Sequence, residues 1–435
     1  MLPMLPTDVT NHKMSLSSKN TPLNVLTFSA LVDSSSGKVS SYDVRRGKVG
    51  NIRILNYNQV NEMFLDREDI GRHKVSDATA QDDLHLLASL ASVINRRRVH
   101  IGRALNAVDA HSDLSIYPLP LPILADKTLD RPQFYTGFPE IRLRFADHTN
   151  TERLGTFDQI PGGITSETMV SEMMILAGRV AGSFGLDHNI PLPYRVQPEP
   201  SDTELAIIDE LKNPETGAMA MSKLISKDVF LPTGNSSIKP GIHYALGVRP
   251  MPQNDINSDA FYRGGYVRVT SPLRRFADLA CHWQLKAKLS GENHPFNFET
   301  MSQLLVQFDQ MDNWVKQIER ASSRYWLWVY INRTLSKKQN YDFEGRSDYT
   351  TFFTPEEQAL LEPIPAIQNI MDVRFNSETL QSTVRISLPQ LGGLPVDCEW
   401  PNGKTPPRKD EIKRVKINRA ESAGLKRTIV CRQVE

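Results

Sequence analysis

The segment Tyr266–Gln284, YVRVTSPLRRFADLACHWQ, is the most informative part of the chain. Pro272 suits the first position of a helix, because its φ is already helical and its missing N–H would be unpaired there. The spacing therefore predicts a helix that begins at Pro272 and carries Arg274 and Arg275 in its first turn. A helix N-terminus favours anions, and guanidinium groups donate paired hydrogen bonds to phosphate oxygens. We expect a phosphate-binding site here, with Asp278 placed to orient one arginine.

The same residues resemble a family signature. Thr270–His282, TSPLRRFADLACH, matches the pattern T-S-P-[IL]-R-R-[YF]-x-D-[LM]-x-x-H of the RNB ribonucleases, which are hydrolytic 3′→5′ exoribonucleases. An arginine pair after a proline, taken alone, would favour a surface helix with a solvated charge pair. Seven fixed and three restricted positions within thirteen residues leave little room for chance.

The resemblance covers most of residues 1–340. Met1–Pro3 resembles a stretch in the middle of the RNB catalytic domain, and Met169–Ala177 resembles its V-E-E-x-M helix. Glu319 falls on a long helix where family members carry a glutamate. The chain departs from the family pattern at Ser171 (for glutamate), Gly178 (for asparagine) and Arg268 (for histidine).

The resemblance implies roles for individual residues. Arg274 matches the family arginine that contacts the scissile phosphate, and Glu319 matches a glutamate placed to accept from a ribose hydroxyl near the RNA 3′ end. These two are the catalytic candidates. The RNA-binding candidates are Glu172, Tyr266, Arg268, Ser271, Arg275, Lys413, Arg414 and Lys416.

Structural alternatives stay open for several of these residues. Glu172 lies on a largely apolar predicted helix, where an unpaired carboxylate is costly, so its partner is either a buried cation or RNA. Arg275 could contact a second phosphate, or pair with Asp278 or Glu172. Tyr266 could stack on a base or pack in the core. A glutamate such as Glu319 and the basic strand residues are often simply solvated.

The family hydrolyses RNA with magnesium, which clustered carboxylates hold as a pair of ions. The RNB pattern for these ligands is D-x5-D-x-D-D, located upstream of the M-L-P stretch. The acids between Asp66 and Asp83 do not follow this spacing, and Asp82-Asp83 favours a role at a helix start. We therefore expect that the chain is a truncated family member, that it lacks the magnesium ligands, and that it is inactive alone.

Hydrophobic periodicity predicts an α+β fold with two domains. The expected strands are 21–33, 39–56 and 140–145, and the expected helices are 58–65, 81–99, 168–184 and 297–336. Residues 113–138 are expected to be loop, residues 191–200 an extended linker, and residues 251–263 an insertion.

The last helix should carry one continuous apolar seam from Leu304 to Val329. We assign residues 1–341 to the C-terminal portion of an RNB domain. Residues 342–435 contain five predicted strands, at 368–376, 380–388, 394–400, 411–419 and 425–432, which is typical of a small OB-type barrel that binds RNA.

Composition narrows the class of protein. The 435 residues have a formal net charge of +1, so any nucleic-acid surface must be local. From Lys404 onward, ten Lys and Arg face four Asp and Glu, leaving a charge of +6 in that segment. Three separated cysteines predict neither a disulfide framework nor a zinc site. No signal peptide or membrane-spanning apolar run is expected.

The resemblance to the RNB family implies an enzyme that, when complete, removes nucleoside 5′-monophosphates from the 3′ end of single-stranded RNA. Fungal mitochondrial family members look most similar, which implies a mitochondrial location and an RNA helicase as partner. The alternatives are a non-catalytic RNA-binding protein and a subunit of an RNA-degradation complex. Oligomeric state is not predicted.

Overall fold

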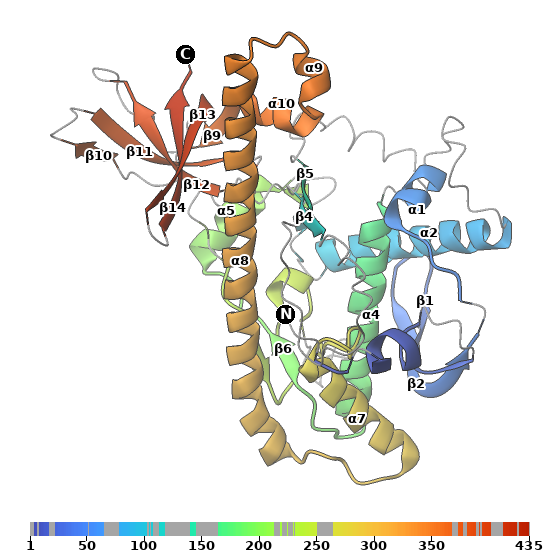
Figure 1. Cartoon of the computed structure of the whole chain (residues 1–435). Coiled ribbons are helices and arrows are strands. Elements are labelled where there is room, and N and C mark those ends of the chain that lie inside the picture. Colours follow the sequence, from blue (N-terminus) through green and yellow to red (C-terminus); the bar gives the residue numbers. More distant parts are fainter. Residues whose placement is uncertain are drawn as a thin grey trace, which may run out of the picture. The chain divides into compact units, whose positions relative to one another are not determined.

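A computed structural model defines the fold (Figure 1). It describes residues 4–6, 8–16, 22–50, 52–64, 78–101, 104, 106–107, 113–117, 140–144, 164–212, 218–219, 224, 229, 231–249, 264–367, 373–376, 381–388, 391, 394–401, 412–423 and 426–434. The chain divides into two compact units. The first comprises Met1–Ala107, Asn150–Met219 and Leu231–Asn313, and the second comprises Val108–Thr149, Ala220–Phe230 and Trp314–Glu435. The predicted domain boundary at 341/342 stays a prediction.

The first unit mixes helices with short sheets. Its elements are η1 (Val9–Lys13), β1 (Leu23–Val32), β2 (Val39–Val49), α1 (Tyr57–Phe64), α2 (Ala78–His100), β3 (Asn106–Ala107), α4 (Ser166–Asp187), β6 (Tyr194–Val196), α5 (Asp202–Leu211), β7 (Ala218–Met219), β8 (Asn235–Ser237), η3 (Tyr244–Leu246), α7 (Phe276–Ser290) and the start of α8 (Phe298–Phe343). The helices predicted at 58–65, 81–99, 168–184 and 297–336 correspond to α1, α2, α4 and α8. The predicted insertion at 251–263 lies outside the described residues.

The antiparallel ribbon of β1 and β2 packs on α4 (Figure 1). The carboxylate of Asp33 accepts the backbone N–H groups of Ser35 and Ser36, and Gly37 takes a positive φ of 66°, so the turn is built from the expected Ser/Gly residues. Val44 is buried against α4, which anchors the ribbon to the core of the first unit.

Helix α4 is the central helix of this unit. Thr165 caps its start, accepting the N–H of Thr168 at 3.2 Å. An 18-residue window of α4 reaches a mean hydropathy of 1.2, enough by length and composition to cross a bilayer, which the sequence analysis did not expect. Because 61% of that window is buried inside the protein, we describe α4 as a core helix.

Two glycines of α4 allow the signature segment (residues 264–284, which contain the signature and the residues before it) to lie against the helix. A Cβ at Gly178 would meet the Tyr266 ring at 2.3 Å and the Val267 carbonyl oxygen at 2.5 Å. A Cβ at Gly182 would lie 2.6 Å from the carbonyl oxygen of Gly264. The glycine at 178, where the family has asparagine, is therefore explained by the close approach of Tyr266.

Gly182→Ala should destabilise the protein by about 1–3 kcal/mol, because a backbone carbonyl cannot swing away from the added methyl group. Chemical denaturation measures this loss. Gly50→Ala is the matched control, because no atom lies within 4 Å of a Cβ built there. Equal free energies of unfolding for the Gly182 variant and the parent would contradict the close packing.

Residues 191–200 are not a linker. Leu192, Tyr194 and Arg195 are buried, and β6 pairs with β8. The N–H of Arg195 donates to the carbonyl of Tyr266 at 2.8 Å, joining β6 to the signature segment. The prediction was wrong because prolines fix extended backbone, which suits a strand end as well as a linker.

Helix α8 is longer than predicted, and its seam is not continuous. Leu305 and Phe308 pack with α7 in the first unit, and Leu327 packs in the core of the barrel in the second unit. Between them, Met311 and Ile318 are 55% and 57% exposed. Helical periodicity alone does not show that the two ends of one helix pack in two different hydrophobic cores.

The second unit contains a curled six-stranded sheet in the order β10-β11-β12-β14-β13-β9, with β9 also pairing with β11 (Figure 1). Its elements are β4 (Asp113–Tyr117), β5 (Glu140–Arg144), α9 (Tyr349–Phe352), α10 (Pro355–Leu361), β9 (Ile364–Ile367), β10 (Val373–Asn376), β11 (Gln381–Leu388), β12 (Leu394–Trp400), β13 (Ile412–Ala423) and β14 (Lys426–Gln433).

The predicted α+β class with a terminal barrel is confirmed. In the second unit, two strands were not predicted, β4 and β9. β4 lies in the stretch predicted as loop and pairs with β5, and the remainder of that stretch, 118–138, lies outside the described residues. β9 contains Pro365, which counts against a strand in the sequence, yet β9 closes the sheet through a single residue pair with β11.

Candidate RNA-binding site

The two arginines of the signature lie before α7, not inside it. The carbonyl of Ser271 accepts the N–H groups of Arg274 at 3.2 Å and Arg275 at 3.0 Å, which closes a turn. Pro272 therefore takes the second position of a β-turn, where its fixed φ is equally favoured. The helix begins at Phe276, so the prediction of a start at Pro272 was wrong.

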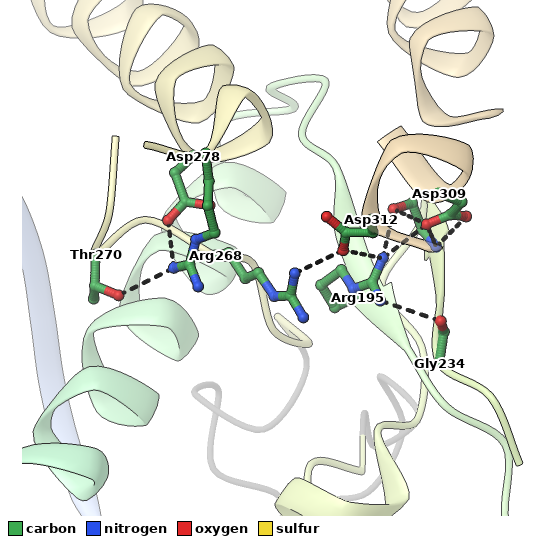
Figure 2. A network of polar contacts seen from close by, with 9 residues as sticks. Arg195, Gly234, Arg268, Thr270, Asp278, Asp309 and Asp312 are labelled. Atoms are coloured by element: carbon green, nitrogen blue, oxygen red, sulfur yellow. Dashed lines mark hydrogen bonds and ion pairs between the residues drawn. The ribbon is translucent and has the colours of Figure 1, made fainter. Parts of the chain in front are cut away.

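Asp278 decides this geometry (Figure 2). Its side chain is fully buried, and one oxygen accepts the N–H of Ser271 at 2.9 Å and the Nη2 of Arg275 at 2.6 Å. The carboxylate thus fixes the turn and offsets the charge of Arg275. Of the alternatives for Arg275, the contacts support the pair with Asp278. Ser271 contributes backbone groups to the turn.

Arg274 has the opposite environment. It is exposed at the turn, and within the described part of the chain its guanidinium makes no hydrogen bond or ion pair. Adjacent arginines therefore differ: Arg275 is held by a buried carboxylate, and Arg274 is available to an anion.

A second pair of arginines, Arg195 of β6 and Arg268 just before the signature turn, lies near Arg275 (Figure 2). Arg195 donates to Asp309 at 2.8 Å and to the carbonyl of Gly234 at 3.1 Å. Arg268 donates to Asp312 at 2.8 Å. The two aspartates are three residues apart on α8 and so share one helix face. They connect α8 to β6 and to the signature segment, a role that the sequence analysis did not assign.

The arginines shift the titration of their neighbours. Burial, with Arg268 acting in the same direction, lowers the pKa of Arg195. Burial, followed by the charges of Arg195 and Arg268, lowers the pKa of His243 to about 4. His243 is thus neutral at physiological pH, and its ring lies edge-on to Tyr266 at a centroid distance of 5.9 Å.

His243 should make stability depend on pH. Its pKa is lower in the folded protein than the ordinary 6.5, so the unfolded chain binds the extra proton between these values and stability falls as pH falls from about 6.5 to about 4. His243→Gln should flatten this slope in denaturation measured across that range. Parallel slopes for parent and variant would contradict the shift.

Tyr266 is half-buried between α4 and His243, and burial raises its pKa. These contacts are those of a packed tyrosine, and stacking on a base stays a prediction. The Nε2–H of His282 donates a hydrogen bond to the carbonyl oxygen of Val269 at 2.7 Å, which holds this partly buried histidine against the signature segment.

Glu172 lies in a buried ion pair. Its side chain is 1% exposed and accepts from Arg98 Nε at 3.0 Å and from Asn95 at 2.8 Å. The partner that the sequence required is Arg98, so the contacts support the structural alternative over RNA contact. Glu319 is exposed on α8, in the other unit from Arg274, so their joint role stays a prediction.

The barrel carries an exposed basic face. Arg414 and Lys416 point outward from β13, alternating with buried Val415, while Lys413 is half-buried. Lys416 pairs across the strands with exposed Arg432, which the sequence analysis did not single out. Like charges directly opposite each other are unfavourable, which suits a surface that binds an anion. On the other neighbouring strand, β12, Glu399 lies opposite Arg432 and forms an ion pair with Arg419 at 2.6 Å.

The described residues do not fit a magnesium site. They contain no group of three or more His, Cys, Asp or Glu side chains placed to hold a metal ion. Asp309 and Asp312 bind guanidinium groups instead. Asp82 and Asp83 lie in the second turn of α2, not at its start, and Asp66 and Asp77 lie outside the described residues.

Comparison with known proteins identifies the family of this chain. The RNB domain matches residues 1–291, two thirds of the sequence. The chain belongs to the RNB family. An uncharacterised ribonuclease of Synechocystis is 34% identical over 172 residues, which cover 40% of this chain and 23% of that protein. The mitochondrial exoribonuclease II of Schizosaccharomyces pombe is 24% identical over 83% of this chain and 36% of its own length.

Solved structures share the fold. An active-site mutant of the Dss1 exoribonuclease from Candida glabrata has a TM-score of 0.65 at 19% identity, covering all of this RNB chain and 45% of that chain. RNase R of Mycoplasma genitalium, in complex with ribose-methylated single-stranded RNA, has a TM-score of 0.60 at 14% identity, covering 99% and 61%. This chain thus spans less than half the length of its first curated relatives.

Proposed function

We propose that this chain forms the phosphate-binding wall of an active site that hydrolyses single-stranded RNA from its 3′ end and releases nucleoside 5′-monophosphates. The observation that carries the proposal is the contrast between two adjacent arginines. Asp278 engages Arg275, while Arg274 is exposed next to the start of α7, where backbone N–H groups also favour an anion. Membership of the RNB family supports RNA as the source of that anion.

Each residue of the wall then has a distinct task. Arg274 binds the scissile phosphate and offsets the charge that develops on its oxygens during water attack. Arg275 and Asp278 hold the turn that presents Arg274. Arg268 and Arg195 are held by Asp312 and Asp309, so they position the wall and add little net charge.

Magnesium is part of the family resemblance, and the described residues offer no ligand set for it. We therefore assign to them only phosphate binding and positioning. We propose that this chain, taken alone, binds RNA without hydrolysing it.

The test is an assay of the purified chain with magnesium on single-stranded RNA labelled at its 5′ end. We expect RNA binding without hydrolysis, and hydrolysis that shortens RNA from the 3′ end when the rest of an RNB domain is joined to it. Hydrolysis by the chain alone would overturn the assignment of inactivity. Binding without hydrolysis in the joined protein would favour the alternative, a non-catalytic RNA-binding protein.

The basic face of the barrel is proposed to contact RNA backbone phosphates. Replacing Arg414 and Lys416 by glutamine should reduce the slope of log affinity against log salt by about 0.7 for each phosphate that the protein no longer neutralises. Arg346→Gln is the matched control, because Arg346 is exposed in the same unit but already pairs with Glu344 and Asp348. A salt slope that is unchanged in the double variant would reject the proposed contact between this face of the barrel and RNA.

We also propose a mitochondrial location. Relatives named as mitochondrial exoribonuclease II, from Schizosaccharomyces pombe and Saccharomyces cerevisiae, match 83% and 77% of this chain. An RNA helicase partner rests only on the resemblance to such proteins. Imaging of the tagged protein with a mitochondrial marker tests the location, and a cytosolic signal would reject it.

A further inference from the structure

Two of the three cysteines lie directly opposite each other in the core of the barrel. Cys398 of β12 and Cys431 of β14 are paired in register, and both side chains are fully buried. All three cysteines of the chain hold free thiols. The sequence did not predict a disulfide, because these two residues are far apart along the chain. The barrel brings them together.

The pairing sets a distance that suits a disulfide. Residues paired across two strands point to the same face of the sheet, and neighbouring strands lie about 4.8 Å apart. The Cα atoms of a disulfide lie roughly 4.4–6.8 Å apart. Both cysteines belong to the same hydrophobic core. Burial, followed by the charge of Cys398, raises the pKa of Cys431, so the two sulfur groups are close enough to act on each other.

The two cysteines also lie where the barrel closes. One half of the sheet comprises β10, β11 and β12, and the other comprises β14, β13 and β9. Among the described strands, the halves meet at two short joints: β12 pairs with β14 over Asp397–Glu399, and β11 pairs with β9 at Ser387 alone. Pairing within each half extends over more residues. The β12–β14 joint is also parallel, which is slightly less stable per residue than antiparallel pairing.

Local opening of a folded protein occurs where few interactions hold it closed. We therefore expect the barrel to open at its two joints before either half unfolds. Opening of the β12–β14 joint separates Cys398 from Cys431 and exposes both thiols to small molecules in solution. A covalent bond between them would hold this joint closed.

We propose that Cys398 and Cys431 form a reversible disulfide, with glutathione disulfide as the oxidant, and that this bond holds the β12–β14 joint closed. One thiolate attacks glutathione disulfide, which gives a mixed disulfide and releases one glutathione. The other thiolate then attacks the protein sulfur of the mixed disulfide and releases the second glutathione. Two protons and two electrons thus pass from the cysteines to one glutathione disulfide, which becomes two glutathione molecules.

Burial decides when this reaction takes place. It raises the pKa of Cys398 to about 12, so that thiol is protonated in the closed barrel. Only the thiolate is a nucleophile. Oxidation therefore follows opening of the joint and is slow while the barrel is closed. Once formed, the bond encloses β13, the strand that carries Arg414 and Lys416, in the linked loop.

Peptide mapping of the whole chain tests the bond. The folded protein is incubated with increasing ratios of glutathione disulfide to glutathione, and the remaining thiols are then blocked with N-ethylmaleimide in denaturant. Trypsin places the three cysteines in separate peptides, 276–286, 386–404 and 428–432. We expect a link between 386–404 and 428–432 whose yield rises with glutathione disulfide and is lost after treatment with dithiothreitol.

Cys281 is the internal control, because it is also fully buried but lies in the first unit. It should remain a thiol throughout. Three results would each overturn the proposal: a link that includes Cys281, glutathione that stays on Cys398 or Cys431 without a link between them, or thiols that all stay free.

Hydrogen exchange tests whether the bond holds the joint closed. Backbone amides of β12 and β14 at the joint should exchange at least several-fold more slowly in the oxidised chain than in the reduced chain. Cys431→Ala should remove this difference, and Cys281→Ala should keep it. Equal exchange in the oxidised and reduced chains would overturn the proposal. If Cys431→Ala does not fold, exchange in the parent before and after dithiothreitol decides the same question.

Discussion

Arg274→Ala is expected to lower the rate of RNA hydrolysis by about 100- to 1,000-fold while RNA affinity changes little. In the proposed function the guanidinium acts on charge that develops on one phosphate during the reaction, whereas affinity is shared among many backbone contacts. The variant is made in the polypeptide that includes the rest of the RNB domain. Single-turnover hydrolysis and equilibrium binding of the same single-stranded RNA separate the two effects.

Lys286→Ala is the control for this variant. Lys286 is an exposed cation on α7, the helix that follows the signature turn. Its removal changes the net charge by the same amount and should leave the rate unchanged. A loss of affinity that accounts for the whole effect of Arg274→Ala would contradict a role in the chemical step.

Glu172→Ala is expected to destabilise the protein by about 3–5 kcal/mol, because it leaves the guanidinium of Arg98 buried without its counter-charge. The side chains of Glu172 and Arg98 are 1% and 9% exposed, so water cannot replace the missing carboxylate. Chemical denaturation measures the loss of free energy of unfolding.

Ser171→Ala is the matched control, because Ser171 is exposed at the neighbouring position of α4. It should change stability by less than about 0.5 kcal/mol. If Glu172 instead serves RNA, its variant will keep the parent's stability and lose RNA affinity. Those two outcomes distinguish the alternatives that the sequence left open.

The sequence predicted elements whose signals are local. Apolar spacing placed α1, α2 and α4 within a few residues of their observed bounds, and strand signals placed β1 and β2. The signature predicted the family, which the match to residues 1–291 confirms. Such signals succeed because neighbours in sequence decide helix faces, turns and motifs.

Long-range contacts set the features that the sequence did not predict. The prediction that a helix starts at Pro272 was wrong because the buried carboxylate of Asp278 accepts a hydrogen bond from the Ser271 N–H and so holds a turn. The aspartates at 309 and 312 resembled ordinary helix charges until β6 and the signature segment placed Arg195 and Arg268 beside them. Gly178 departs from the family pattern, and its reason is a long-range contact: the ring of Tyr266 lies against it.

Matched lysine substitutions at the two adjacent arginines test the central claim most directly, with the single-turnover rate of RNA hydrolysis as the measurement. Arg275 reaches Asp278 through one nitrogen, at 2.6 Å, which a lysine can replace. Arg274→Lys should lose at least about tenfold in rate, since an ammonium cannot make a paired contact with phosphate oxygens. Arg275→Lys should stay near the parent's rate. Equal losses, or a greater loss at Arg275, would contradict the division of roles between the two arginines.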